Sequence, residues 1–336
     1  MIGAAYGCAM RCRVLVLVPV VAALAAACVP PPGGGVPKRY LDRVFPQVST
    51  TQNVKYATAP DLVTGAPVDL KLDVFTPAGD TLTNRPAVIW VHGGGFRTGT
   101  KAATTTVASE YAQRGYVTFS IDYRLDPGNR CQDVQDGKIT DPDQLAAETA
   151  RCKAAVFAAQ HDTQAVVRFV RASASSYGVN PGMVAVGGFS AGAVTALHVA
   201  YRSDDPGDVG DFDGVDSRIQ AALAASGCNY DQGSIGPGDA PTFLLHAEFD
   251  QAVPFACAQS TAQRAHDAGL VAETMFFYGE ATHAKALYDK YKAQVDARWT
   301  SFLVQQLFGA LEVEVPGPTP SPTPAAPVQA AVRFTG

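Results

Sequence analysis

The pentapeptide Gly-Phe-Ser-Ala-Gly at residues 188–192 constrains the fold of this chain more than any other stretch. The apolar run at residues 183–187 predicts a buried strand before it, and residues 191–201 predict a helix after it. A Ser at the apex of a strand–turn–helix in this pattern is a nucleophile elbow. The turn strains the backbone of Ser190, so small residues are required two positions away on either side, where chain segments pass close together. We therefore expect Ser190 to project from a sheet edge, in front of a helix N-terminus that favours negative charge.

Strand-like and helix-like runs alternate along the central part of the chain. The first two strands, at residues 54–57 and 68–76, alternate polar and apolar side chains as a half-exposed antiparallel pair would. The later alternation predicts an α/β fold, with a mostly parallel sheet, helices on both faces and all carboxyl strand ends at one edge. The other expected strands are residues 87–92, 117–122, 183–187, 242–246 and 273–278, and the expected helices are residues 104–114, 142–154, 163–177, 191–201, 256–268 and 284–308.

Composition is consistent with a globular protein and argues against one class of partner. Of the 336 residues, 47% are apolar and 17% charged, which suits a sizeable core. The formal net charge is −5, which provides no basic surface for nucleic acid. We expect one ordered domain at residues 39–311. The sequence does not indicate whether this domain forms oligomers.

The first 28 residues have the composition of an export signal. Arg11 and Arg13 form a positive region, and the apolar run at residues 14–27 is too short to be a good membrane span. The run ends in Leu-Ala-Ala-Ala-Cys28, which resembles a bacterial lipobox with its Leu one position too early. We favour lipidation of Cys28 and attachment to the outer face of the bacterial cell membrane. Ordinary cleavage after Ala-x-Ala, giving an extracellular protein, is the alternative.

Two other segments lack the pattern of a folded domain. Residues 29–38 form a Pro/Gly linker that would hold the domain away from a membrane or wall. Residues 312–336 include a Pro/Thr/Ser stretch that cannot bury a core, so we expect a disordered tail.

Export makes the cysteines informative. Four of them follow the signal segment, and an even number in an oxidising compartment predicts two disulfides. Of three possible connectivities we favour the two sequence-local pairs, each closing a loop of roughly 20 to 30 residues and contributing about 3 kcal/mol. A zinc site is the competing interpretation, but no C-x-x-C spacing supports it. The favoured pairs are Cys131 with Cys152 and Cys228 with Cys257.

The stretch at residues 126–162 is longer than a simple strand-to-helix connection. Asp141 can cap a helix that has Pro142 at its first position. With one of the favoured disulfides tying its ends, the stretch is predicted to be an insertion above the active edge. A lid or substrate wall is one interpretation, and a stabilising surface excursion is the other.

A nucleophilic Ser requires a base and an acid that orients the base, and both have candidates. Asp250 follows the expected strand at residues 242–246, and His283 follows the one at residues 273–278. Each lies just past a strand end, at the same edge as Ser190. Ser, Asp and His also occur in the chain order that this kind of fold requires. Glu248 is the rival for the acid.

A glycine-rich turn supplies candidates for stabilising a developing oxyanion. His-Gly-Gly-Gly-Phe at residues 92–96 comes directly after an expected strand. Successive glycines let backbone N–H groups approach an alkoxide without hindrance from Cβ. Ala191, the residue after the nucleophile, supplies another N–H. A phosphate cradle is the rival interpretation, but neither a following Gly-Lys-Ser/Thr nor G-x-G-x-x-G is present.

Four motifs in order make the chain resemble an α/β-hydrolase-fold serine esterase or lipase of the HGGG type, similar to hormone-sensitive-lipase-like and bacterial feruloyl- or acetyl-esterase-like enzymes. The resemblance covers roughly residues 40–307. It implies that Gly94 and Gly95 donate to the oxyanion and that His92 braces their loop. It also favours Asp250 over Glu248, because D-x-x-V-P from Asp250 matches the acid loop of the family. The motifs are LDVFTP at residues 72–77, AVIWVHGGGF at 87–96, GYVTFSIDYR at 115–124 and GFSAG at 188–192.

Two departures from the family pattern are the disulfide-tied insertion and Ala193, where many relatives have another Gly. The insertion affects the expected substrate size and not the reaction. The sequence thus predicts an exported serine carboxylic-ester hydrolase with an acyl-enzyme intermediate, acting on short-acyl or carbohydrate-linked esters and needing no metal or organic cofactor. A serine peptidase or amidase on the same fold, and a non-catalytic surface binding protein, are the alternatives.

Overall fold

The computed structural model of the chain describes residues 39–205, 207, 209–212 and 214–309. The expected signal segment at residues 1–28 with Cys28, the linker at residues 29–38 and the tail at residues 312–336 lie outside these residues. Among the described residues no helix is long and apolar enough to cross a membrane.

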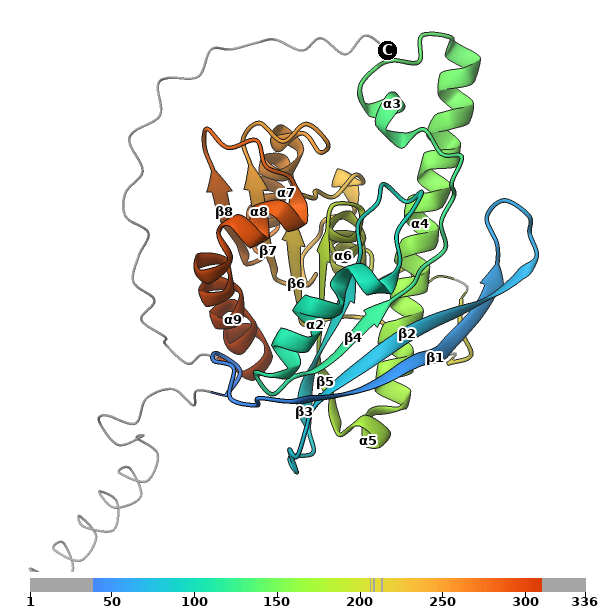
Figure 1. Cartoon of the computed structure of the whole chain (residues 1–336). Coiled ribbons are helices and arrows are strands. Elements are labelled where there is room, and N and C mark those ends of the chain that lie inside the picture. The colour runs from blue at the N-terminus through green and yellow to red at the C-terminus, as the bar shows by residue number, and fades with distance from the viewer. Residues whose placement is uncertain (1–38, 206, 208, 213, 310–336) are drawn as a thin grey trace, which may run out of the picture. The chain divides into compact units, whose positions relative to one another are not determined.

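The strands of the described chain form one eight-stranded sheet (Figure 1). They are β1 (Val48–Pro60), β2 (Pro67–Pro77), β3 (Arg85–Val91), β4 (Val117–Ile121), β5 (Val179–Phe189), β6 (Ala221–Ala225), β7 (Thr242–Ala247) and β8 (Ala272–Phe277). Their order is β1-β2-β4-β3-β5-β6-β7-β8. β1 pairs antiparallel with β2, and β2 with β4, whereas every pair from β4 to β8 is parallel. The predicted mostly parallel sheet, with an antiparallel pair at its start, is confirmed.

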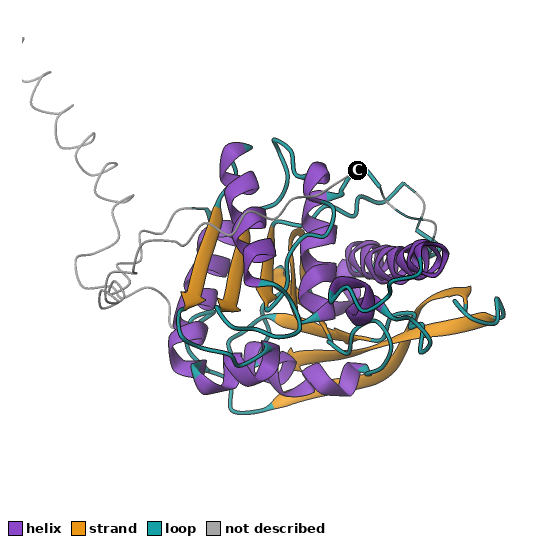
Figure 2. Ribbon diagram, turned by 90° about the horizontal axis from the view of Figure 1, so that it is seen from above, coloured by secondary structure: helices purple, strands orange, loops and turns teal. Residues whose placement is uncertain are grey.

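Helices cover both faces of this sheet (Figure 2). α4, α6 and α7 contribute to the buried cluster on one face, and α2, α8 and α9 to the cluster on the other. β3 shows why a parallel strand reads as a continuous apolar run, since Ile89 and Val91 belong to the first cluster and Val88 and Trp90 to the second. The α-helices are α2 (Thr105–Ala112), α3 (Cys131–Gln135), α4 (Pro142–Ala172), α5 (Ala174–Tyr177), α6 (Ala191–Tyr201), α7 (Phe255–Asp267), α8 (Ala284–Lys290) and α9 (Lys292–Phe308).

Three element predictions differ from the structure. The single helix expected at residues 284–308 is two helices, α8 and α9, which are separated at Tyr291. β6 was not expected, because its sequence Ala-Ala-Leu-Ala-Ala has low strand propensity, and it forms only as a fully buried strand between β5 and β7. The helix expected at residues 142–154 and most of the one expected at residues 163–177 are a single helix of 31 residues, α4, and residues 174–177 form the separate helix α5. The polar residues between the two expected helices did not end α4, because Asp162 is buried and accepts hydrogen bonds from the backbone N–H and the guanidinium of Arg124.

The predicted insertion is shorter than residues 126–162. The structure has the expected start of α4, with Asp141 Oδ1 accepting from the N–H of Gln144 at 2.8 Å and Pro142 in the first turn. Residues 155–162, however, mostly belong to the buried part of α4, which packs on the sheet. Only α3 and the exposed first part of α4 project beyond the sheet, at the end where the parallel strands finish (Figure 1).

Candidate active site

Ser190 occupies the tight turn between β5 and α6. Its backbone has φ 57° and ψ −121°, a conformation that costs on the order of 1–3 kcal/mol for a residue other than Gly. The flanking glycines are required by close contacts. A Cβ on Gly188 would lie 2.1 Å from the carbonyl oxygen of Gly192, and a Cβ on Gly192 would lie 2.1 Å from that of Val91. The structure therefore has the strained elbow that the Gly-x-Ser-x-Gly pattern predicts.

The three residues proposed as nucleophile, base and acid lie together at the carboxyl edge of the sheet. Ser190 Oγ is 2.8 Å from His283 Nε2. His283 Nδ1 lies 2.7 Å from Asp250 Oδ2 and 2.9 Å from Oδ1. Asp250 follows β7 and His283 follows the neighbouring strand β8, immediately before α8. Ser190, 93 positions before His283, meets them because β5 ends at the same edge of the sheet. This arrangement can move a proton from a Ser hydroxyl to an imidazole.

The environment of Asp250 keeps its carboxylate ionised. Burial alone opposes the charge, but hydrogen bonds from His283 and from two backbone N–H groups outweigh it, so the pKa of Asp250 lies below its ordinary value. Those N–H groups belong to Ala252, at 2.9 Å, and Val253, at 3.1 Å from Oδ1. The rival acid Glu248 instead accepts a hydrogen bond from the N–H of Gly279 at 2.7 Å.

A second buried histidine supports the loop that carries Asp250. His246 Nε2 is 3.0 Å from the carbonyl oxygen of Val253 and 3.7 Å from Asp250 Oδ2. Burial lowers the pKa of His246, so a neutral ring that donates to Val253 is favoured. His246 therefore stabilises the loop that carries Asp250. Among the described residues it forms no hydrogen bond with Ser190.

The glycine-rich turn after β3 has the backbone that its sequence requires. Gly94 and Gly95 have φ values of 118° and 63°, which favour glycine. A Cβ on Gly93 would lie 2.8 Å from the carbonyl oxygen of Phe189 and 3.1 Å from Ser190 Cβ, so this turn passes directly beside the nucleophile. In the described part of the chain, the N–H groups of Gly94, Gly95 and Ala191 donate to no protein acceptor, which leaves them available to a bound oxyanion.

His92 braces the turn from the buried side. Its Nδ1 is 2.7 Å from the carbonyl oxygen of Gly93, and its ring stacks on Tyr123 with 4.3 Å between centroids. The Tyr123 hydroxyl donates to the carbonyl oxygen of His92 at 3.0 Å. Burial lowers the pKa of His92, which keeps its ring neutral. His92 thus has a bracing position, as the resemblance implied.

Sequence reasoning missed Ser226, which follows β6. Its Oγ accepts a hydrogen bond from the N–H of Ala284 at 2.8 Å, directly after His283 in the chain. Ser226 is fully buried and has φ 53°. It therefore fixes the backbone that carries the imidazole. Because β6 was not expected, no pattern in the sequence indicated a residue at this position.

Both favoured disulfides are present in the structure. Cys131 and Cys152 join α3 to α4, with 5.2 Å between their Cα atoms. Cys228 and Cys257 join the loop after β6 to α7, with 5.7 Å between their Cα atoms. Within the described residues no group of three His, Cys, Asp or Glu side chains is placed to hold a metal ion.

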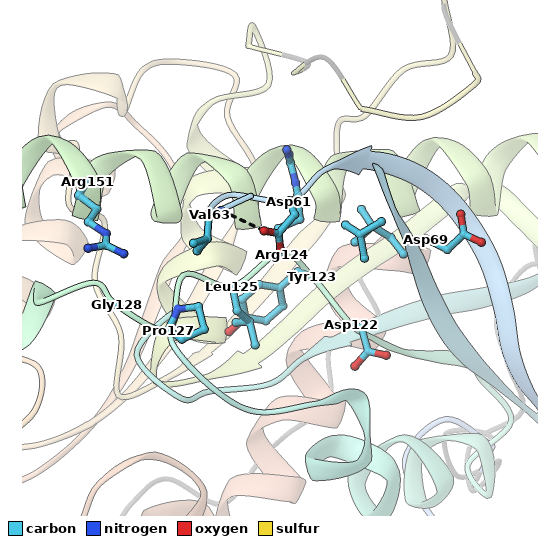
Figure 3. Close-up of a pocket in the computed structure, with 12 residues that line it drawn as sticks. Asp61, Val63, Asp69, Asp122, Tyr123, Arg124, Leu125, Pro127, Gly128 and Arg151 are labelled. Atoms are coloured by element: carbon cyan, nitrogen blue, oxygen red, sulfur yellow. Dashed lines mark hydrogen bonds between the residues drawn. The ribbon is translucent and has the colours of Figure 1, made fainter. Parts of the chain in front are cut away.

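A cavity of about 550 Å³ lies near the carboxyl edge of the sheet, but none of the three candidates Ser190, Asp250 and His283 lines it (Figure 3). It is bounded by the tip of the β1–β2 hairpin, the loop after β4 and Arg151 of α4. Tyr123 lines it and stacks on His92, so one aromatic ring separates the cavity from the glycine-rich turn. Arg151 extends from α4 toward the segment containing Pro127 and Gly128.

Comparison with solved structures establishes the fold. Esterase 2 of Thermogutta terrifontis, phosphorylated by paraoxon, matches with a TM-score of 0.59 and 21% identity over 78% of this chain and 95% of that one. The propionate-bound form of the same esterase matches with a TM-score of 0.57 and 20% identity over 76% of this chain and 95% of that one. This chain has the α/β-hydrolase fold. Its resemblance to serine esterases and lipases is supported by sequence relatives as well.

The sequence relatives cover a smaller part of this chain. The BD-FAE family model matches residues 72–138 and 149–229. A protein named "Probable carboxylic ester hydrolase LipM" from Mycobacterium tuberculosis is 27% identical over 154 residues, which are 45% of this chain and 30% of that protein. Lipase 1 of Geotrichum candidum is 28% identical over 177 residues, which are 51% of this chain and 29% of the lipase. The matched stretch thus spans about a third of the length of these curated relatives.

Proposed function

We propose that this α/β-hydrolase is a serine carboxylic-ester hydrolase. The observation that carries the proposal is the continuous hydrogen-bonded line from Ser190 Oγ through His283 to a buried carboxylate of Asp250. The names of the relatives, which include carboxylic ester hydrolase, lipase and esterase, support the same reaction class.

In the proposed mechanism Ser190 Oγ attacks the ester carbonyl carbon while His283 Nε2 takes its proton. Asp250 holds the imidazole in the required tautomer and stabilises the imidazolium. The negative oxygen of the tetrahedral intermediate binds the N–H groups of Gly94, Gly95 and Ala191. His283 then returns its proton to the leaving alcohol. Water, activated by the same imidazole, hydrolyses the acyl-enzyme and regenerates Ser190.

We further propose that the substrates are short-acyl esters, including esters of carbohydrates, and that the protein is exported or lipid-anchored through Cys28. The esterase of Thermogutta terrifontis has been solved with propionate and with butyrate, which supports a short acyl group. The two disulfides support an oxidising compartment, as does the export-like composition at residues 1–28.

Hydrolysis of p-nitrophenyl esters from acetate to palmitate by the mature protein tests the proposal. We expect turnover that falls steeply beyond butyrate, and a loss of at least about a thousandfold in Ser190→Ala, because that variant lacks the nucleophile. Ser175→Ala is the matched control, since Ser175 is exposed on α5. Stoichiometric labelling of wild type but not Ser190→Ala by paraoxon is also expected. Undiminished ester turnover in Ser190→Ala, or cleavage of dipeptide anilides without cleavage of any ester, would refute the proposal.

A further inference from the structure

Asn129, in the loop after β4, makes an unusually complete set of hydrogen bonds for a loop residue. Its side chain is fully buried. Nδ2 donates to the carbonyl oxygen of Gly95 at 3.2 Å and to that of Asp126 at 2.9 Å, and Oδ1 accepts from the N–H of Cys131 at 3.2 Å. One amide group therefore links the glycine-rich turn to the start of the disulfide-tied excursion.

Two further contacts join the same segments. The N–H of Asp126 donates to the carbonyl oxygen of Phe96 at 2.9 Å, and Arg97 Nε donates to that of Pro127 at 3.4 Å. Gly95 has little other support, because it is exposed and a Cβ built on it would meet no atom within 4 Å. The carbonyl oxygen of Gly94 accepts within the turn from the N–H groups of Arg97 at 3.1 Å and Thr98 at 3.2 Å, so residues 126–129 hold the following Gly95–Phe96 end of the turn.

Helix α4 in turn anchors that segment at both ends. Arg151 contacts both carboxylate oxygens of Asp126 at 2.5 Å, and this pairing lowers the pKa of the carboxyl group. The next residue, Cys152, forms the disulfide with Cys131. Figure 3 shows Arg151 reaching toward Gly128, where an added Cβ would lie 2.3 Å from its Nη2 atom. Consecutive residues of a long helix therefore hold the segment that contains Asn129.

We propose that Asn129 is a positioning residue for the oxyanion-binding turn, and that the Cys131–Cys152 disulfide acts on turnover through it. The assignment rests on the proposed function, because only an ester or related carbonyl substrate develops an oxyanion at this turn. Its physical basis is geometric. Donors stabilise a transition state only if they already point to where the charge develops, and an unbraced glycine turn samples other orientations.

The expected effect is on the chemical step. Loss of a complete oxyanion donor costs about 10²- to 10³-fold in kcat. Asn129→Ala leaves the donors in place without their brace, so we expect a loss in kcat of about tenfold and a change in KM of less than about twofold. Asn129→Asp keeps the size of the side chain and an acceptor for Cys131, but removes the donor to Gly95. It should therefore lose kcat to a similar extent.

The experiment compares Asn129→Ala, Asn129→Asp, the Cys131→Ser/Cys152→Ser double variant and the triple variant that adds Asn129→Ala to it. Active sites are counted by stoichiometric reaction with paraoxon, so kcat refers to folded, competent enzyme. Inhibition by a trifluoromethyl ketone that forms a tetrahedral adduct should weaken in proportion to kcat/KM. Gln132→Ala is the matched control, because Gln132 is exposed on α3 and, among the described residues, its side-chain amide bonds only to Asp136.

If the disulfide acts through Asn129, the double variant loses kcat, and the triple variant loses no more than Asn129→Ala alone. Wild-type kcat per active site in both Asn129 variants would refute the assignment, as would losses that multiply in the triple variant. Should Asn129→Ala fail to fold, Asn129→Asp and the disulfide variant decide the question. Absence of ester turnover in the wild type would refute the proposed function and this assignment with it, whereas full turnover in the variants would refute the assignment alone.

Discussion

Replacing Gly192 with Ala is expected to lower both the stability and the turnover of this protein, although Ala is the better helix former. Gly192 lies in the first turn of α6, where helix propensity alone favours Ala by about 1 kcal/mol. An Ala Cβ there would, however, lie 2.1 Å from the carbonyl oxygen of Val91 and 2.7 Å from that of His92. Both atoms are backbone, at the point where β3 becomes the glycine-rich turn, so no side-chain rotation relieves the contact.

The magnitude follows from those distances. Contacts of a real Cβ are essentially never shorter than 3.0 Å, so the two backbones must separate by about 0.9 Å, which is 3.0 minus 2.1. Overpacking of this kind costs about 1–3 kcal/mol, and a backbone clash belongs at the upper end. Subtracting the propensity gain leaves a net loss of about 2 kcal/mol, or roughly 4–8 °C in Tm for a domain of this size. A shift of about 1 Å between Ser190 and its oxyanion donors should also reduce kcat by up to about a hundredfold.

Thermal unfolding and p-nitrophenyl butyrate turnover per titrated site measure the two effects. Gly236→Ala is the control, because a Cβ there meets no atom within 4 Å and the backbone does not have positive φ. We expect Gly236→Ala to match the wild type within about 0.5 kcal/mol. Wild-type Tm and kcat in Gly192→Ala would show that the packing argument for the elbow is wrong.

Two further predictions concern stability. Burial lowers the pKa of His198 to about 4, so between pH 6.5 and 4 the unfolded chain binds a proton that the folded chain excludes. The free energy of unfolding should then fall by up to about 3 kcal/mol as the pH is lowered over this range. In urea titrations at several pH values, this free energy should depend less on pH in His198→Leu than in the wild type. Replacing Cys228 and Cys257 by Ser should cost about 3 kcal/mol in the same assay, since their disulfide closes a loop across 29 positions. Equal stability of this double variant and the wild type under non-reducing conditions would contradict the prediction for the disulfide.

The catalytic edge could be predicted from the sequence because parallel strands impose it. Each triad candidate follows an apolar run, and right-handed crossovers bring all carboxyl strand ends to one edge. The meeting of Ser190, Asp250 and His283 therefore required only that the runs be recognised as strands. The need for Gly188 and Gly192 could be predicted as well, since their spacing reflects close contacts within a few residues of Ser190.

The elements that sequence reasoning missed depend on distant partners. β6 is five residues long and four of them are Ala, so only its place between β5 and β7 makes it a strand. α4 continues through Asp162 because Arg124, 38 positions away, satisfies the buried carboxylate. Local propensity predicts neither the strand β6 nor the continuation of α4, because burial and pairing exist only once the sheet has formed.

Reacting residues and positioning residues differ in what the fold requires of them. A reacting side chain must reach the substrate, and the fold restricts such residues to a few strand ends that a pattern can reveal. A positioning residue needs only to satisfy a backbone group, and any loop that passes nearby can supply it. Ser226 holds the residue after His283 across 58 positions, and Asn129 holds Gly95 across 34. Their roles follow from the packing of loops after β4 and β6, so variants at these positions test what the structure adds to the sequence.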